Sequence, residues 1–192
     1  MLWTLIIIGV IVVVLLFLVV GAYNKLVNLD QTADQAFADI DVQLKQRQDL
    51  IPNLVETVKG YATHERGTLE AVIQARNAAT QATGVNDKVQ AENMLTGALG
   101  RLFALSEAYP DLKANTNFQQ LQMDLSDIEN KLAAARRFFN NAVSEFNAVR
   151  RQFPTVLFAA RVGFGSDKPF FDVGEAERAT MSAEPPTVNF QA

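Results

Sequence analysis

The chain begins with an apolar segment, residues 2–20, in which Thr4 is the only polar residue and no charged side chain precedes Lys25. A helix of this length extends about 28 Å, close to the ~30 Å hydrocarbon layer of a bilayer. Within lipid, a single segment can satisfy its own backbone hydrogen bonds only as a helix. We therefore predict a transmembrane anchor over residues 1–22, with lipid or interfacial contacts at Leu2, Trp3, Ile8, Val14, Leu18 and Tyr23.

The residues that flank this segment bear on its processing and orientation. Small residues at Gly21 and Ala22 leave a cleaved signal peptide as the alternative, with cleavage before Tyr23. The segment lacks a basic n-region and exceeds the usual ~7–15 apolar residues, so we expect it to be retained. Basic residues follow it but none precedes it, which favours an N-terminus outside and a C-terminal domain in the cytoplasm.

A second pattern begins at Phe118, where apolar residues recur in alternating steps of three and four. This heptad seam is typical of a coiled-coil helix. Thr116 and Gln119 match a capping box, and Pro154 stops the pattern, which predicts a helix over residues 115–153. The seam consists of Phe118, Leu121, Leu125, Ile128, Leu132, Ala135, Phe139, Ala142, Phe146, Val149 and Phe153.

A similar stripe runs from Ala33 to Val72 and continues in phase through Pro52. Two interpretations stay open: one long kinked helix over residues 24–82, which the continuous phase favours, or two helices that meet at residues 49–53. A shorter helix is predicted over residues 87–109, after Gly84 as the C′ residue of the preceding helix.

Arg47 lies on the apolar seam of the stripe that runs from Ala33 to Val72. We expect its charged end to reach past the core, with a buried carboxylate pair as the alternative.

These patterns define the predicted fold. No strand-like alternation occurs between residues 23 and 153, so we predict an all-α protein. Its transmembrane helix precedes an elongated antiparallel bundle of three to four long helices, of the four-helix up-and-down type, over residues 23–161. Residues 162–192 form an irregular tail, whose Phe170, Phe171 and Phe190 can dock on the bundle.

One stretch carries a family resemblance. Residues 40–55, IDVQLKQRQDLIPNLV, with Lys59-Gly60-Tyr61-Ala62, His64-Glu65, Ala75-Arg76 and residues 109–115, YPDLKAN, resemble the signature of the LemA family. The resemblance covers nearly the whole chain. It implies a bacterial single-pass membrane protein with a four-helix domain and leaves the biochemical role open.

The residue types needed for catalysis are scarce. The chain has no Cys and a single His, and Thr68 replaces the second ligand of a His-Glu-x-x-His zinc motif that would start at His64. We therefore predict no enzyme activity, metal or cofactor, and the net charge of −4 gives no support for nucleic-acid binding. For His64 we expect a solvated helix face, with a phosphotransfer site on the bundle as the alternative.

Charged residues gather in two places. Asp30, Asp34, Asp39 and Asp41 follow the anchor, and the last long helix ends in basic residues. Ordinary solvated faces are the simplest interpretation. The sharper hypothesis pairs the two groups within the domain or between protomers, or places the basic end on anionic lipid. The candidate assembly or lipid contacts are Asp39, Asp41, Arg150, Arg151, Arg161, Phe170 and Phe171.

Together these features predict a non-enzymatic scaffold or adaptor in the bacterial inner membrane. We expect it to form a homo-oligomer, because the helix predicted over residues 87–109 is too short to cover the seam of residues 115–153. Its other partners are membrane lipid and an unidentified membrane-associated protein. The alternatives are a phosphotransfer bundle and a device that senses lipid or curvature.

Overall fold

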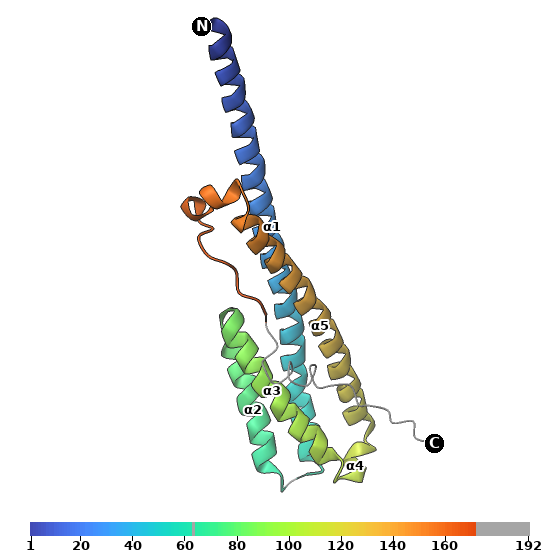
Figure 1. Cartoon of the computed structure of the whole chain (residues 1–192). Coiled ribbons are helices and arrows are strands. Elements are labelled where there is room, and N and C mark those ends of the chain that lie inside the picture. Colours follow the sequence, from blue (N-terminus) through green and yellow to red (C-terminus); the bar gives the residue numbers. More distant parts are fainter. Residues whose placement is uncertain (63, 172–192) are drawn as a thin grey trace, which may run out of the picture. The chain divides into compact units, whose positions relative to one another are not determined.

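The computed structural model describes residues 1–62 and 64–171, and all the regular elements in these ranges are helices. The prediction of an all-α fold with a long apolar N-terminal helix is confirmed. The described residues of the chain divide into two compact units: residues 1–46 with 126–170, and residues 47–125 with Phe171. The elements are α1 (Leu2–Lys59), α2 (Arg66–Gln81), α3 (Gly84–Ser106), α4 (Pro110–Lys113), α5 (Thr116–Arg151) and the 3₁₀ turns η1 (Thr155–Leu157) and η2 (Ala159–Val162) (Figure 1).

α1 is one helix that continues through Pro52, as the continuous phase favours, so the alternative of two helices that meet at residues 49–53 is wrong. The expected extent of this helix, to residue 82, is also wrong, because α1 ends at Lys59. After Lys59 the backbone N–H groups of Tyr61 and Ala62 both donate to the Val58 carbonyl, at 3.0 and 2.9 Å, in a turn that begins at Gly60, a poor helix former. The chain then reverses into α2.

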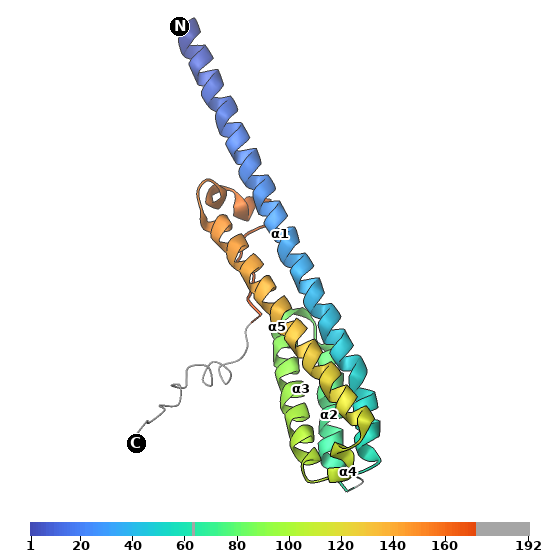
Figure 2. The same ribbon diagram turned by 90° about the vertical axis from the view of Figure 1, so that its right-hand side faces the viewer.

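The apolar stripe keeps its phase across this reversal because both helices face the same core. In the second unit, the last turns of α1 pack with α2, α3, α4 and the first turns of α5. Both views show α2 and α3 side by side (Figures 1 and 2). α3 begins and ends three residues earlier than predicted, and Gly84 takes its left-handed φ of 78° at the first residue of α3, not after α2.

α5 matches its predicted span to within two residues, but its cap differs. Asn115 Oδ1 accepts a hydrogen bond from the Phe118 backbone N–H at 3.0 Å, so Asn115 is the N-cap and Thr116 is already inside the helix. The heptad seam is buried or half-buried from Phe118 to Val149, and only Phe153 is exposed. In the first unit, for example, the rings of Phe37 and Phe139 lie 5.5 Å apart.

The two 3₁₀ turns close one end of the first unit. Both figures show them beside α1, where it leaves the apolar segment (Figures 1 and 2). Leu26, Phe146 and Ala159 are buried in one cluster there, and the Phe164 ring lies edge-on to Phe146 at 5.9 Å. Residues 172–192 of the predicted tail, with Phe190, lie outside the described residues.

Candidate functional site

The apolar part of α1 has the properties of a membrane anchor. Within the residues that the structure describes, α1 is the one helix long and apolar enough to cross a membrane. None of its apolar stretch is buried within the protein, as lipid contact requires. The six predicted contact residues are all exposed, from 40% for Tyr23 to 77% for Trp3. α1 continues without a break from this stretch into the folded part.

Next to the anchor, a polar cluster holds the segment that follows η2. The Asn147 side chain makes two hydrogen bonds to the backbone of Lys168: its Nδ2 donates to the Lys168 carbonyl at 3.0 Å, and its Oδ1 accepts from the Lys168 N–H at 2.9 Å. The Lys168 ammonium contacts Asp30 at 2.9 Å and Asp34 at 2.6 Å, and it lies 5.5 Å from the centre of the Phe146 ring. We call these five residues the tail clamp.

The ammonium in the tail clamp has an altered acidity. Burial lowers the pKa of Lys168, but the hydrogen bonds and negative charges of Asp34 and Asp30 outweigh this effect, so its pKa is above the ordinary value. Lys168 therefore stays charged at physiological pH values.

The basic end of α5 pairs with the same segment. Arg150 and Arg151 both contact the carboxylate of Asp167, with Arg150 Nε at 2.9 Å from its Oδ1. The hypothesis that pairs these arginines with the acidic run of α1 within the domain is not what the described residues show: Lys168 takes that place for Asp30 and Asp34. The difference arises because residues 163–170 fold back beside α1 and α5 and supply both charges. The pairing between protomers stays a prediction.

The other predicted contact residues are dispersed. Asp39 is exposed and Asp41 half-buried on α1, and Arg161 is exposed and donates to the Leu157 carbonyl at 3.1 Å. The paired phenylalanines differ: Phe171 is buried, whereas Phe170 is about half exposed. Their roles in assembly or lipid binding stay predictions.

A buried polar network joins α1 to α3 in the second unit. Arg47 is almost fully buried, and its Nη1 lies 3.1 Å from Glu92 Oε2, while its Nη2 donates to Thr96 Oγ1 at 2.9 Å. Gln48 Nε2 donates to the other Glu92 oxygen at 3.0 Å. The expectation that Arg47 extends past the core is therefore wrong, and the alternative of a buried carboxylate pair is correct. Removal of either partner of such a buried pair would leave an uncompensated charge inside the protein, which is strongly destabilising.

Arg76 of α2 completes this network at the proline of α1. In a regular helix, the Gln48 carbonyl would accept a hydrogen bond from the N–H of residue 52, which Pro52 lacks. Arg76 Nε donates to this carbonyl at 3.0 Å, and Thr80 Oγ1 contacts the Gln48 side chain at 3.4 Å. α2 thus supplies the donor that the proline withholds, which makes Pro52 tolerable inside α1.

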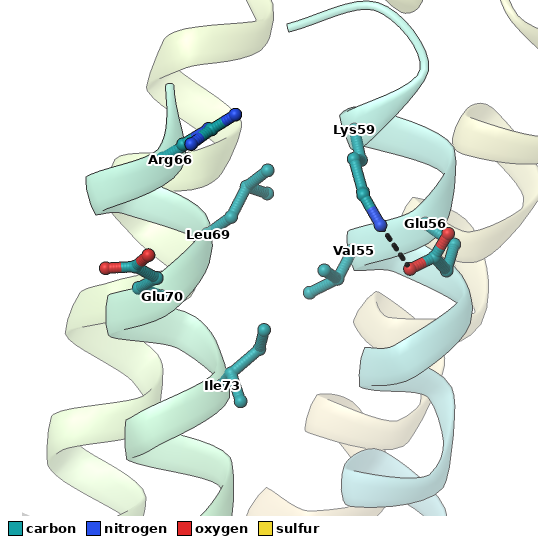
Figure 3. Close-up of a pocket in the computed structure, with 7 residues that line it drawn as sticks. All are labelled: Val55, Glu56, Lys59, Arg66, Leu69, Glu70 and Ile73. Atoms are coloured by element: carbon teal, nitrogen blue, oxygen red, sulfur yellow. Dashed lines mark hydrogen bonds and ion pairs between the residues drawn. The ribbon is translucent and has the colours of Figure 1, made fainter. Parts of the chain in front are cut away.

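On the surface of the second unit, a groove lies between the end of α1 and the start of α2. Figure 3 shows Leu69 and Ile73 of α2 pointing toward Val55 of α1. Along its rim, Lys59 forms an ion pair with Glu56 at 3.3 Å. The cavity has a volume of about 440 Å³, within the range of small-ligand or side-chain pockets, and Arg66 and Glu70 complete its lining.

The only histidine is not placed for chemistry. His64 is exposed in the loop between α1 and α2, not on a helix face as predicted. Nearby, Tyr109 Oη donates to Glu65 at 3.3 Å; burial, then the charge and hydrogen bond of Glu65, raise the pKa of Tyr109, so the phenol stays neutral. Among residues 1–62 and 64–171 no three His, Cys, Asp or Glu side chains gather where they could hold a metal ion.

Together, an exposed apolar N-terminal helix and the amphipathic helices that follow it define a class, the helical-bundle proteins with a single candidate membrane anchor. Within this class the chain belongs to the LemA family. The sequence model of that family, described as LemA family, matches residues 36–190, which is most of the chain. The resemblance seen in the sequence is thereby confirmed.

Three relatives illustrate the family relationship. The chain is 25% identical over 166 residues to Protein LemA of Metamycoplasma hominis, a match that covers 86% of this chain and 75% of the relative. It is 21% identical over 168 residues to Magnetosome protein MamQ of Magnetospirillum gryphiswaldense and 22% identical to MamQ 2 of Paramagnetospirillum magneticum. These matches cover 74% of this chain but only 62% of each MamQ protein.

Proposed function

We propose that this protein is a non-enzymatic, membrane-anchored helical adaptor that presents a helical surface to a membrane-associated protein. The observation that carries the proposal is the unbroken course of α1 from the apolar segment into the folded part. A continuous helix holds the residues after the anchor at a defined position above the bilayer, which a flexible Gly/Ser linker would not do.

The groove between α1 and α2 is the surface that best suits a protein partner. Val55 and Leu69 form an apolar floor, and Ile73 adds an apolar side chain that is 42% exposed. Charges of both signs surround this floor, as in grooves that accept the apolar face of a partner helix. We propose an amphipathic helix of a membrane-associated protein as the occupant.

Three observations support a binding role over a catalytic one. The names of the three relatives carry no enzymatic activity. His64 is exposed in the loop between α1 and α2, not on a helix of the bundle as the phosphotransfer alternative places it. The buried charged residues Arg47 and Glu92 are engaged with each other inside the second unit.

Self-association and membrane orientation are separate parts of the proposal. The prediction of a homo-oligomer rested on an uncovered seam, but that seam is buried or half-buried within the single chain from Phe118 to Val149, so the adaptor proposal does not depend on self-association. We retain the bacterial inner membrane, with the N-terminus outside and the bundle in the cytoplasm, on the charge distribution around the anchor.

A photo-crosslinking experiment tests the groove. p-Benzoylphenylalanine at Ile73 is expected to form an adduct with a defined protein in intact membranes, and a Leu69→Glu change should abolish this adduct because it puts a charge on the apolar floor. The matched control is the same probe at Met123 of α5, which is also apolar and exposed. Equal adducts from both positions, or none from Ile73, would reject the groove as the partner site.

A further inference from the structure

The end of the first unit beside the anchor exposes a group of apolar side chains. They belong to residues 153–162, which contain both 3₁₀ turns. A soluble surface rarely exposes so many large apolar groups close together without a binding role. Their exposed fractions are 79% for Phe153, 54% for Val156, 61% for Leu157 and 41% for Val162.

The packing of this segment fixes its distance from the anchor. Ala159, between Leu157 and Val162, is buried in one cluster with Leu26 of α1. Leu26 follows Val20, the last residue of the apolar segment, by six residues, about 9 Å along a helix. The headgroup region on each side of a bilayer is roughly 5–8 Å thick. With the apolar segment across the bilayer, residues 153–162 therefore lie at the membrane surface.

We propose that residues 153–162 form a second membrane contact, in which Phe153, Val156, Leu157 and Val162 insert into the lipid interface. The proposal rests on the anchoring role of α1 and adds a site to it. Lipid is the occupant that the position selects, because the apolar surface lies next to the anchor. Arg161 is exposed on the same segment and can reach lipid phosphate groups, as interfacial arginines do.

The position of Tyr23 agrees with this arrangement. Its ring is 40% exposed on α1, one turn before Leu26, where an aromatic side chain is expected to mark the interface. The anchor and the two 3₁₀ turns would then hold the first unit to the bilayer at two points. Two contacts restrict its rotation and tilt, whereas a single helix leaves both free.

The absence of cysteine allows a direct test on the full chain. Single cysteines at Leu157, Ile8 and Phe138 are labelled with a nitroxide in nanodiscs of phosphatidylcholine and phosphatidylglycerol. Accessibility to oxygen, which concentrates in lipid, is compared with accessibility to a water-soluble nickel chelate. Phe138 is the matched control, because it is an exposed apolar residue of α5 about 20 Å along the helix from Arg151, the last residue of α5.

We expect an oxygen-to-nickel ratio at Leu157 that is several-fold above that at Phe138 and closer to that at Ile8, and a label at Val162 should agree. A ratio at Leu157 equal to that at Phe138, with Ile8 in lipid, would overturn the second contact and leave the anchor intact. A water-like ratio at Ile8 would overturn the anchor and this proposal together.

Discussion

Replacement of Arg76 by methionine tests how α1 accommodates Pro52. Methionine keeps most of the apolar stem but removes the donor that lies 3.0 Å from the Gln48 carbonyl. A hydrogen bond from a charged donor contributes about 1.5–3 kcal/mol to the free energy of unfolding. The Arg76→Met variant should therefore lose this amount, whereas Arg101→Met, at an exposed position of α3, should lose less than about 0.5 kcal/mol.

The same substitution in a Pro52→Ala background isolates the cause. Alanine restores an N–H at residue 52 and relieves a cost of up to ~3 kcal/mol, so this variant should be more stable than the wild type. The Gln48 carbonyl then has a backbone donor within α1. Loss of the Arg76 side chain should cost less than about 1 kcal/mol in this background, a coupling of at least ~0.5 kcal/mol between residues 52 and 76.

Amide hydrogen exchange of the full chain in detergent micelles measures these differences. The expected loss makes amide exchange in α2 roughly 10- to 150-fold faster in Arg76→Met than in the wild type. In the Pro52→Ala background, the same substitution should make exchange less than about 5-fold faster than in Pro52→Ala alone. If Arg76→Met has the same effect with and without Pro52, the guanidinium does not compensate for the proline, and this explanation of the uninterrupted α1 is refuted.

Further predictions concern the other polar contacts. Glu92→Leu leaves a buried guanidinium and should cost about 3–5 kcal/mol by exchange of α3, whereas the double change with Arg47→Met should cost less than Glu92→Leu alone; additive effects would contradict the buried pair. Asn115→Ala should lower stability by about 1 kcal/mol in thermal unfolding, whereas Thr116→Ala should have little effect. A larger loss from Thr116→Ala than from Asn115→Ala would support the capping box as first predicted. Asn147→Ala removes two hydrogen bonds and should speed proteolysis of the segment around Lys168, and unchanged cleavage would argue against the tail clamp. Because the pKa of Lys168 is raised in the folded chain, its contribution to stability is complete below its ordinary value of 10.5 and is lost as pH rises through the raised value; Lys168→Met should therefore flatten the alkaline part of a series of thermal melts.

Periodicity in the sequence predicts the helices of this protein well. The seam from Phe118 to Val149 gives α5 and its buried face, and the apolar run gives the first part of α1. The end of α1 at Lys59 is harder to predict, because the stripe on α2 continues the same phase after the reversal. A periodic pattern reports which face is buried but not whether one helix or two carry that face.

The partners in the polar contacts depend on tertiary structure and could not be predicted. Arg47 on an apolar seam signals a buried charge, yet its partner, Glu92, is 45 residues away on another helix. The roles of Asn147 and Lys168 follow from the return of the chain beside α1 and α5, for which the sequence has no local signal. Pro52 marks a carbonyl without its helical donor, a signal that could have prompted a search for a donor such as Arg76.

The central claim is that α1 both anchors the chain and continues into its folded part, and the intact mass of the native protein tests it most directly. Membranes that contain the full-length protein are washed at alkaline pH, which removes peripheral proteins. The intact mass of the retained protein is then measured by mass spectrometry. We predict that the protein stays in the membrane with residues 2–22 present. Recovery in the wash of a protein that begins at Tyr23 would show that the segment is a cleaved signal peptide and would contradict the claim.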